Sequence, residues 1–269
     1  MTISTTGTHV AAVLVAALGG ILASGTADAR SLEEIKESGV ISIVTTSSSP
    51  PHGFLSPDSG ELEGIMFEVG RAVADKLGVE AEFTEVPFNG LIPSLRSDRA
   101  DLMSGPLFIT EKREEVVDFT QPVYGWGEGL VTQEDSDTTY ANLESLGGQT
   151  VGTLIDSVQY EMIKNVPDVE GIRTYRDYIS LIADIRAGRI DVGVIDPPSI
   201  AYQIKLHGIE GVRLAEDYKP VNNWKVGMAV NEGNAELLEA VNNAIAELKS
   251  SGELKRILTD WGVGNLIAE

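Results

Sequence analysis

Residues 88–101 read FNGLIPSLRSDRAD, and residues 178–191 read YISLIADIRAGRID. The two stretches share five identical residues, and Phe88/Tyr178 and Leu95/Ile185 are conservative pairs. The identical pairs are Leu91/Leu181, Ile92/Ile182, Arg96/Arg186, Arg99/Arg189 and Asp101/Asp191. Each copy predicts a helix, a turn and a strand, and the strand ends near Pro106 or near Asp196. The alternative to a true repeat is a coincidence between two helix–strand units of similar composition.

The repeat predicts two lobes that face one cleft, because parallel strands of α/β units end at a shared crevice. Strand-like and helix-like segments alternate along the rest of the chain, which favours an α/β fold. Residues 64–77 predict an amphipathic helix that ends at Gly78, and Asn234 is expected to cap a long helix that ends at Gly252. Short strands are expected at 40–45, 80–85, 150–153, 192–195 and 225–230.

Composition excludes several classes of protein. The 269 residues include no Cys and three His, so thiol catalysis, thiolate metal sites and a lipoprotein anchor are excluded. The formal net charge is −21, which would repel nucleic acid and anionic membranes. We therefore expect no nucleic-acid partner, no metal, no cofactor and no catalytic residues.

The N-terminus predicts export. Residues 10–23 form an apolar run that is too short to span a bilayer, and Ala27-Asp28-Ala29 fits the small-x-small rule for signal peptidase. Residues 1–29 are therefore predicted to be a signal peptide cleaved near Ala29, which makes the mature protein periplasmic with no direct membrane anchor. A mispredicted start or a buried helix is the alternative, because the first residues carry few cations.

Six motifs in the right order resemble the family 3 extracytoplasmic solute-binding proteins, which are receptors of ABC importers for polar amino acids and compatible solutes. The motifs are PPHGF (50–54), GELEGIMFEVGRAVADKLG (60–78), PFNGLIPSLRSDRADL (87–102), ITEKREEVVDFTQPVY (109–124), AGRIDVGVIDPPSIAY (187–202) and the segment 226–262. The resemblance extends from about Leu32 to Trp261.

The resemblance implies an α/β chain with the two-lobed type II periplasmic-binding-protein fold, in which each lobe is a mostly parallel sheet flanked by helices. Lobe 1 would hold residues 30–122 plus 227–269, and lobe 2 would hold residues 128–221. Hinges at 123–127 and 222–226 would let the lobes close on a small zwitterionic ligand. The partner would be an ABC permease in the inner membrane, and the protein would be a monomer.

Arg113 and Asp196 are the charged pair that the resemblance assigns to the ligand. The family places an arginine at Arg113 to clamp the ligand carboxylate, for which a guanidinium offers two parallel donors. An aspartate at Asp196 would bind the ammonium group. The alternatives are a solvated Arg113 paired with Glu111 or Glu115, and an Asp196 that only caps the helix after Pro197.

Other expected ligand contacts follow the family pattern or depart from it. Phe88 matches an aromatic that lies against the ligand, or else belongs to the core. Phe108 replaces a small hydroxyl residue and resembles ectoine-type receptors, where aromatic faces enclose a delocalised cation. Pro106 stands where Gly or Ser is usual, Ser49 replaces an aromatic lid, and His52 replaces a Phe.

In the second lobe, Asp156-Ser157-Val158 replaces a Gly-Thr-Thr turn, and Ser157 is expected to cap the following helix and bind carboxylate. These departures weigh against a standard glutamine-like or histidine-like ligand. Trp126 and Trp224 lie in the predicted hinges, where packing between the lobes is expected more than ligand contact. Trp261 is expected to be structural.

The sequence therefore predicts a non-enzymatic receptor for an amino acid or its derivative. One alternative is an ectoine- or betaine-like ligand. A second is a cyclohexadienyl-type dehydratase on the same scaffold, with His52 or Asp156 as proton donor. A third is a sensor that presents its ligand to a chemoreceptor.

Overall fold

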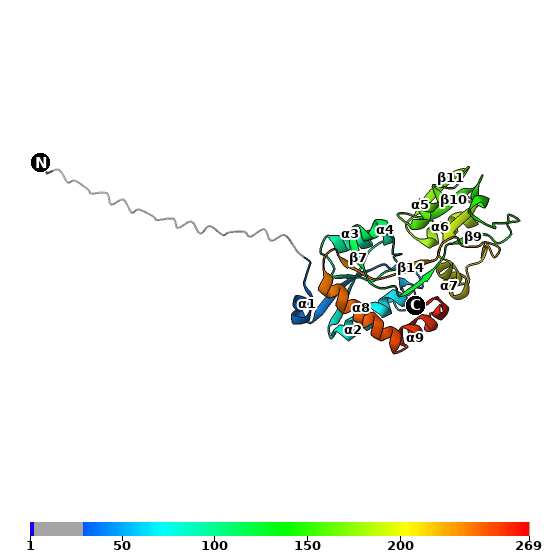
Figure 1. Cartoon of the computed structure of the whole chain (residues 1–269). Coiled ribbons are helices and arrows are strands. Elements are labelled where there is room, and N and C mark those ends of the chain that lie inside the picture. Colours follow the sequence, from blue (N-terminus) through cyan, green and yellow to red (C-terminus); the bar gives the residue numbers. More distant parts are fainter. Residues whose placement is uncertain (3–28, 269) are drawn as a thin grey trace.

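The computed structural model describes residues 1–2 and 29–268, of which residues 204–207 are described as backbone only. The predicted signal peptide therefore lies almost wholly outside the described residues. The described chain forms two five-stranded mixed sheets, each with helices packed on it (Figure 1). The α/β prediction with two lobes is confirmed.

The first sheet has the order β5-β1-β6-β15-β7, and only β15 runs against the other strands. Its strands are β1 (Val40–Thr45), β5 (Glu80–Glu85), β6 (Leu102–Met103), β7 (Val117–Phe119) and β15 (Ala229–Asn231). Ile41 and Ile43 face the larger core cluster, whereas Val44 lies in the smaller one, because successive side chains of a strand point to opposite faces.

Helices cover both faces of this sheet. The larger core is formed with α1 (Leu32–Ser38), α2 (Ile65–Leu77), α8 (Ala235–Ser250) and α9 (Glu253–Asp260). The smaller core is formed with α3 (Leu91–Arg96), which follows the 3-10 turn η1 (Phe88–Gly90). The predicted helix over 64–77 is confirmed, and it ends at Gly78, whose positive φ of 76° suits glycine.

The second sheet has the order β11-β10-β12-β9-β13, again with one strand, β9, antiparallel to its neighbours. Its strands are β9 (Gly129–Gln133), β10 (Thr150–Leu154), β11 (Gly171–Tyr175), β12 (Val192–Ile195) and β13 (Val212–Leu214). The helices are α5 (Val158–Ile163), α6 (Tyr178–Arg186) and α7 (Pro197–His207), with the 3-10 turn η2 (Leu143–Leu146).

The chain passes between the sheets twice, and the two crossings pair with each other. β8 (Tyr124–Trp126) and β14 (Trp224–Val226) form an antiparallel ribbon in which Trp126 lies opposite Trp224. The 3-10 turn η3 (Gly264–Leu266) packs on β8. The described chain also contains a short sheet of β2 (Ser48–Ser49), β3 (Gly53–Leu55) and β4 (Leu62–Glu63), and the helix α4 (Glu111–Glu114) before β7.

Two local predictions need correction. The expected single strand at 225–230 is two strands, because β14 belongs to the ribbon and β15 to the first sheet. Asn234 does occupy the N-cap position of α8, but its side chain makes no capping bond. Its side-chain amide instead donates to the carbonyl of Arg30 at 2.9 Å, which holds Arg30 to this helix.

The repeat corresponds to equivalent positions in the two sheets. β6 and β12 each lie between a parallel neighbour and an antiparallel one, and each follows the helix of its repeat copy. Asp101 accepts a hydrogen bond from the amide of Ser42 at 2.8 Å, and Asp191 accepts one from the amide of Thr150 at 2.7 Å. Asp101 thus joins the start of β6 to the middle of β1, and Asp191 joins the start of β12 to the start of β10.

We expect Asp101→Ala to lower the free energy of unfolding by about 1.5–3 kcal/mol, because the buried carboxylate also pairs with Arg30. Asp191→Ala should cost less than about 1 kcal/mol, because Asp191 is exposed. Urea unfolding measures both, with the exposed Asp58→Ala as control. Equal losses for the two aspartates would contradict this account.

Candidate ligand-binding site

The carboxylate of Asp196 is the centre of the candidate site. Asp196 follows β12, is 8% exposed, and accepts hydrogen bonds from three side chains. Trp126 Nε1 and Gln159 Nε2 donate to Oδ1 at 2.8 Å each, and the Tyr178 hydroxyl donates to Oδ2 at 2.7 Å. Burial raises the pKa of this carboxyl, and the three donors lower it in turn.

Asp196 occupies the N-cap position of α7, as the alternative interpretation expected, but its side chain makes no capping bond. The carboxylate instead points to donors on the ribbon, on α5 and on α6. The prediction missed Gln159 and Tyr178 as its partners. Tyr178 could have been found, because it is the counterpart of Phe88 in the repeat.

Arg113 lies in the four-residue helix α4 and is 9% exposed. Its Nη1 donates to the carbonyl of Phe108 at 2.9 Å, and its Nη2 donates to the carbonyl of Asp156, beyond the end of β10, at 3.3 Å. The solvated arginine paired with Glu111 or Glu115 is therefore not what the structure contains. Arg113 reaches across from the first sheet to the second.

Arg113 and Asp196 lie close enough for their charges to interact. Burial lowers the pKa of Arg113 to about 10, and the charges of Asp196 and Asp156 act in the opposite direction. Arg113 therefore remains a cation at neutral pH. The two opposite charges come from different sheets, which is the arrangement a zwitterion would bridge.

An aromatic cluster packs beside Asp196. The ring of Phe108 lies 4.9 Å from Trp126 and 5.0 Å from Trp224, measured between centroids. His52 stacks on Trp126 at 4.6 Å with an interplanar angle of 6°. Trp126 and Trp224 thus pack within this aromatic cluster. Because its neighbours enclose Phe108, which is 4% exposed, little of its ring is open to a cation.

His52 is fully buried between β2 and β3. Its Nδ1 lies 2.7 Å from the Tyr124 hydroxyl, and its Nε2 has no hydrogen-bond partner. Burial lowers the pKa of His52 to about 3, so the ring is neutral at pH 7. The neutral ring of His52 packs on Trp126 as the Phe of the family pattern would, and it adds polar nitrogen atoms at the ring edge.

The other expected ligand residues lie in several different elements. Ser157 caps α5, as predicted, by accepting from the amide of Tyr160 at 3.1 Å, and Val158 is the first residue of that helix. Ser49 and Pro106 are buried, and Phe88 is half-buried against the core under α3. Trp261 donates to Glu68 at 2.8 Å and packs edge-on to Phe54, which agrees with a structural role.

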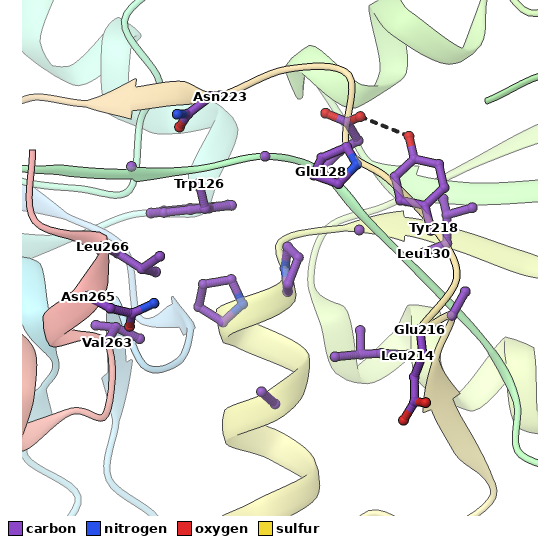
Figure 2. A pocket seen from close by; sticks show the side chains of 18 of the residues that line it. Trp126, Glu128, Leu130, Leu214, Glu216, Tyr218, Asn223, Val263, Asn265 and Leu266 are labelled. Carbon is purple, nitrogen blue, oxygen red and sulfur yellow. Dashed lines mark hydrogen bonds between the residues drawn. The ribbon is translucent and has the colours of Figure 1, made fainter. Parts of the chain in front are cut away.

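A separate cavity of about 780 Å³ lies beside the ribbon (Figure 2). None of the nine predicted ligand residues lines this cavity, whose wall includes Trp126, Leu214, Tyr218, Asn265 and Leu266. The buried Glu128 on this wall accepts from the Tyr218 hydroxyl at 2.8 Å and from the amide of Val221 at 2.6 Å. Glu128 thus ties the outgoing crossing to the returning one, and the predictions missed it.

The described residues contain no group of three or more His, Asp or Glu side chains that could hold a metal ion. No helix within residues 29–268 combines the length and the apolar composition that a membrane crossing needs.

The chain belongs to the bacterial extracellular solute-binding proteins, family 3, whose profile matches residues 41–264. The L-cystine-binding protein TcyJ of Escherichia coli (strain K12) is 30% identical over 253 residues, which cover 92% of this chain and 91% of that protein. The histidine-binding periplasmic protein of the same strain is 31% identical over 213 residues, which cover 74% of this chain and 78% of that protein.

A solved structure agrees in fold. The amino acid ABC transporter substrate-binding protein AbpA from Streptococcus pneumoniae, bound to L-arginine, superimposes with a TM-score of 0.79 at 25% identity, covering 88% of this chain and 100% of that chain. The family resemblance and the type II periplasmic-binding-protein fold expected from the sequence are confirmed.

The buried His52 should make folding sensitive to mild acid. Its pKa is about 3 in the folded state and near 6.5 in the unfolded chain, so protons bind the unfolded state preferentially below pH 6.5. We expect the free energy of unfolding to fall by up to about 1.4 kcal/mol per pH unit between pH 6.5 and 5. In His52→Asn this slope should be smaller, as urea unfolding at several pH values would measure. Identical slopes would contradict the assignment.

Proposed function

We propose that this protein captures an amino acid outside the cytoplasm and delivers it to the permease of an ABC importer. The observation that carries the proposal is the pair of buried opposite charges, Arg113 and Asp196, which come from different sheets. Arg113 would clamp the ligand carboxylate and Asp196 would accept its ammonium group. The relatives named above bind cystine, histidine or arginine, which supports an amino acid as the ligand class.

Closure of two lobes would couple capture to delivery. We place lobe 1 at residues 30–122 and 227–269, lobe 2 at 128–221, and the hinges at 123–127 and 222–226. A ligand that contacts both Arg113 and Asp196 would favour the closed form, because only that form makes both contacts. The ribbon of β8 and β14 would bend while each sheet stays rigid, and the permease would recognise the closed monomer.

Export through a signal peptide cleaved near Ala29 would place the protein in the periplasm, where an importer collects its substrate. The other expected wall residues would then shape the pocket: Phe88, Phe108, Pro106, Ser49, His52, Ser157 and Val158. Catalysis is not part of the proposal, and the family comprises binding proteins.

A thermal-shift screen tests the ligand class. The protein, freed of co-purified ligand by unfolding and refolding, is heated with the twenty amino acids, ectoine, betaine and prephenate. A ligand at about 100 times its Kd should stabilise the folded state by about 2.7 kcal/mol. Stabilisation by an amino acid supports the proposal. Stabilisation by ectoine or betaine alone would favour a compatible-solute receptor, and consumption of prephenate would favour a dehydratase.

Arg113→Ala should lower the affinity for the amino acid by about 100-fold or more, because the ligand carboxylate loses a two-pronged cationic donor. Arg113→Lys should recover only part of this loss, because an ammonium cannot offer two parallel donors. Lys112→Ala is the matched control on the same short helix, since that side chain is 82% exposed. Isothermal titration measures all three, and an unchanged affinity in Arg113→Ala would reject the clamp.

A further inference from the structure

Tyr202 belongs to α7, which packs with the second sheet, yet its ring lies against two rings of the first lobe. The ring centroid of Tyr202 is 5.5 Å from that of Phe54, with an interplanar angle of 58°, and 5.9 Å from that of Trp261, with an angle of 45°. Phe54 lies in β3, and Trp261 directly follows α9. Both distances fall within the range of about 4.5–7 Å in which tilted aromatic rings attract each other. We call Tyr202, Phe54 and Trp261 the three-ring contact.

The first lobe holds its two rings in place without Tyr202. Phe54 and Trp261 pack edge to face, with centroids 5.7 Å apart and an interplanar angle of 88°. Trp261 Nε1 donates to Glu68 of α2 at 2.8 Å, and Phe54 is only 6% exposed within a strand that pairs with β2 and β4. The two rings therefore form a fixed surface, on which Tyr202 packs from the other lobe.

The rest of the boundary between α7 and the C-terminal segment 259–267 is loosely packed. Figure 1 shows α7 beside α9 and the C-terminus. The cavity of about 780 Å³ beside the ribbon lies along this boundary, and a second cavity of about 400 Å³ shares Pro198, Ala201 and Val263 with it and reaches Tyr202 and Trp261. Atoms that line a cavity lose dispersion contacts across it. The three-ring contact therefore supplies much of the attraction across this boundary.

Helix α7 connects the three-ring contact to the candidate site. Asp196 is the N-cap residue of α7, and Tyr202 lies in the second turn of the same helix. Because a helix moves as a rigid unit, a displacement of α7 would carry the Asp196 carboxylate and the Tyr202 ring together. Tyr202 thus packs on the first lobe only when Asp196 has a particular position relative to that lobe.

The lobes also touch at a second place, between α4 and α5. Arg113 Nη2 donates to the carbonyl of Asp156 at 3.3 Å, and Lys112 Nζ lies 3.9 Å from a carboxylate oxygen of Glu161. The structure therefore combines the three-ring contact with contact between the lobes at Arg113. This is the arrangement expected of a closed form.

We infer that Tyr202 is a positioning residue for ligand binding, because its packing on Phe54 and Trp261 stabilises the closed form. The inference rests on the proposed function, which supplies the amino acid ligand and the motion of the lobes. Opening at the ribbon separates Tyr202 from the other two rings, and a ligand held by Arg113 and Asp196 brings them together again. The ligand and the three-ring contact favour the same form, so loss of the contact lowers the affinity for the ligand.

Isothermal titration of the refolded protein with each of the twenty amino acids identifies the tightest binder, which is then titrated into the variants. Tyr202→Ala should lower the affinity for that amino acid by about 5- to 100-fold, because two aromatic pairs are lost. Tyr202→Phe keeps the ring and should retain most of the affinity. An unchanged affinity in Tyr202→Ala, or an equal loss in Tyr202→Phe, would overturn the inference.

Phe67→Ala is the matched control for the loss of a ring. Phe67 of α2 is half-buried, as Tyr202 is, and its ring lies 4.5 Å from that of Phe83 in the same lobe. This variant should lower the urea midpoint and leave the affinity for the amino acid unchanged. Equal losses of affinity in Phe67→Ala and Tyr202→Ala, at urea midpoints that show both to be folded, would overturn the inference.

A distance measurement separates the inference from the proposed function. The chain has no Cys, so Lys112→Cys combined with Glu161→Cys provides two unique sites for spin labels, one on each side of the contact between α4 and α5. Tyr202→Ala should reduce the share of molecules with the short distance, both without amino acid and at equal sub-saturating concentrations of it. An unchanged share would overturn the inference. Binding of no amino acid, together with a reduced share, would reject the proposed function and keep the three-ring contact as a closing contact.

Discussion

The carboxylate of Asp196 is buried, and three side chains from three segments donate to it. Trp126 comes from the ribbon, Gln159 from α5 and Tyr178 from α6. A buried charge is costly unless hydrogen bonds replace its water, so these donors must stay in place for the carboxylate to remain charged. Asp196 therefore fixes the first crossing strand against the second sheet. The stack of Trp126 on His52 extends that constraint to the turn between β2 and β3.

The cation of the site is held differently. Among the described residues, Arg113 donates only to two carbonyl oxygens, which are neutral, and burial lowers its pKa. Its charge is thus incompletely compensated, in contrast to the charge of Asp196. A ligand carboxylate would supply the negative charge that the two carbonyl groups lack. Under the proposed function, this asymmetry would make Arg113 the stronger attraction for a ligand, and Asp196 the more rigid framework for its recognition.

The repeat shows how a short sequence pattern relates to a whole fold. The identical leucines, Leu91 and Leu181, lie fully buried under their sheets, and the identical aspartates bind a strand amide in each copy. The one conservative aromatic pair differs in chemistry, because Tyr178 carries a hydroxyl that reaches Asp196 and Phe88 does not. The same framework thus serves packing in one sheet and the candidate site in the other.

The sequence alone determined the α/β class, the two units, the family, the helix of 65–77 and the candidates Arg113 and Asp196. The α/β class, the two units and the helix depend on local periodicity and on turn glycines, which are properties of neighbours in the chain. The family and the candidates Arg113 and Asp196 come from the resemblance of six motifs in the right order. Tertiary structure alone decided that Gln159 and Tyr178 satisfy Asp196, that Glu128 joins the two crossings, and that 225–230 divides between two sheets. Those contacts join residues far apart in the chain, and burial, which sets the pKa of His52 and of Arg113, exists only once the chain has folded.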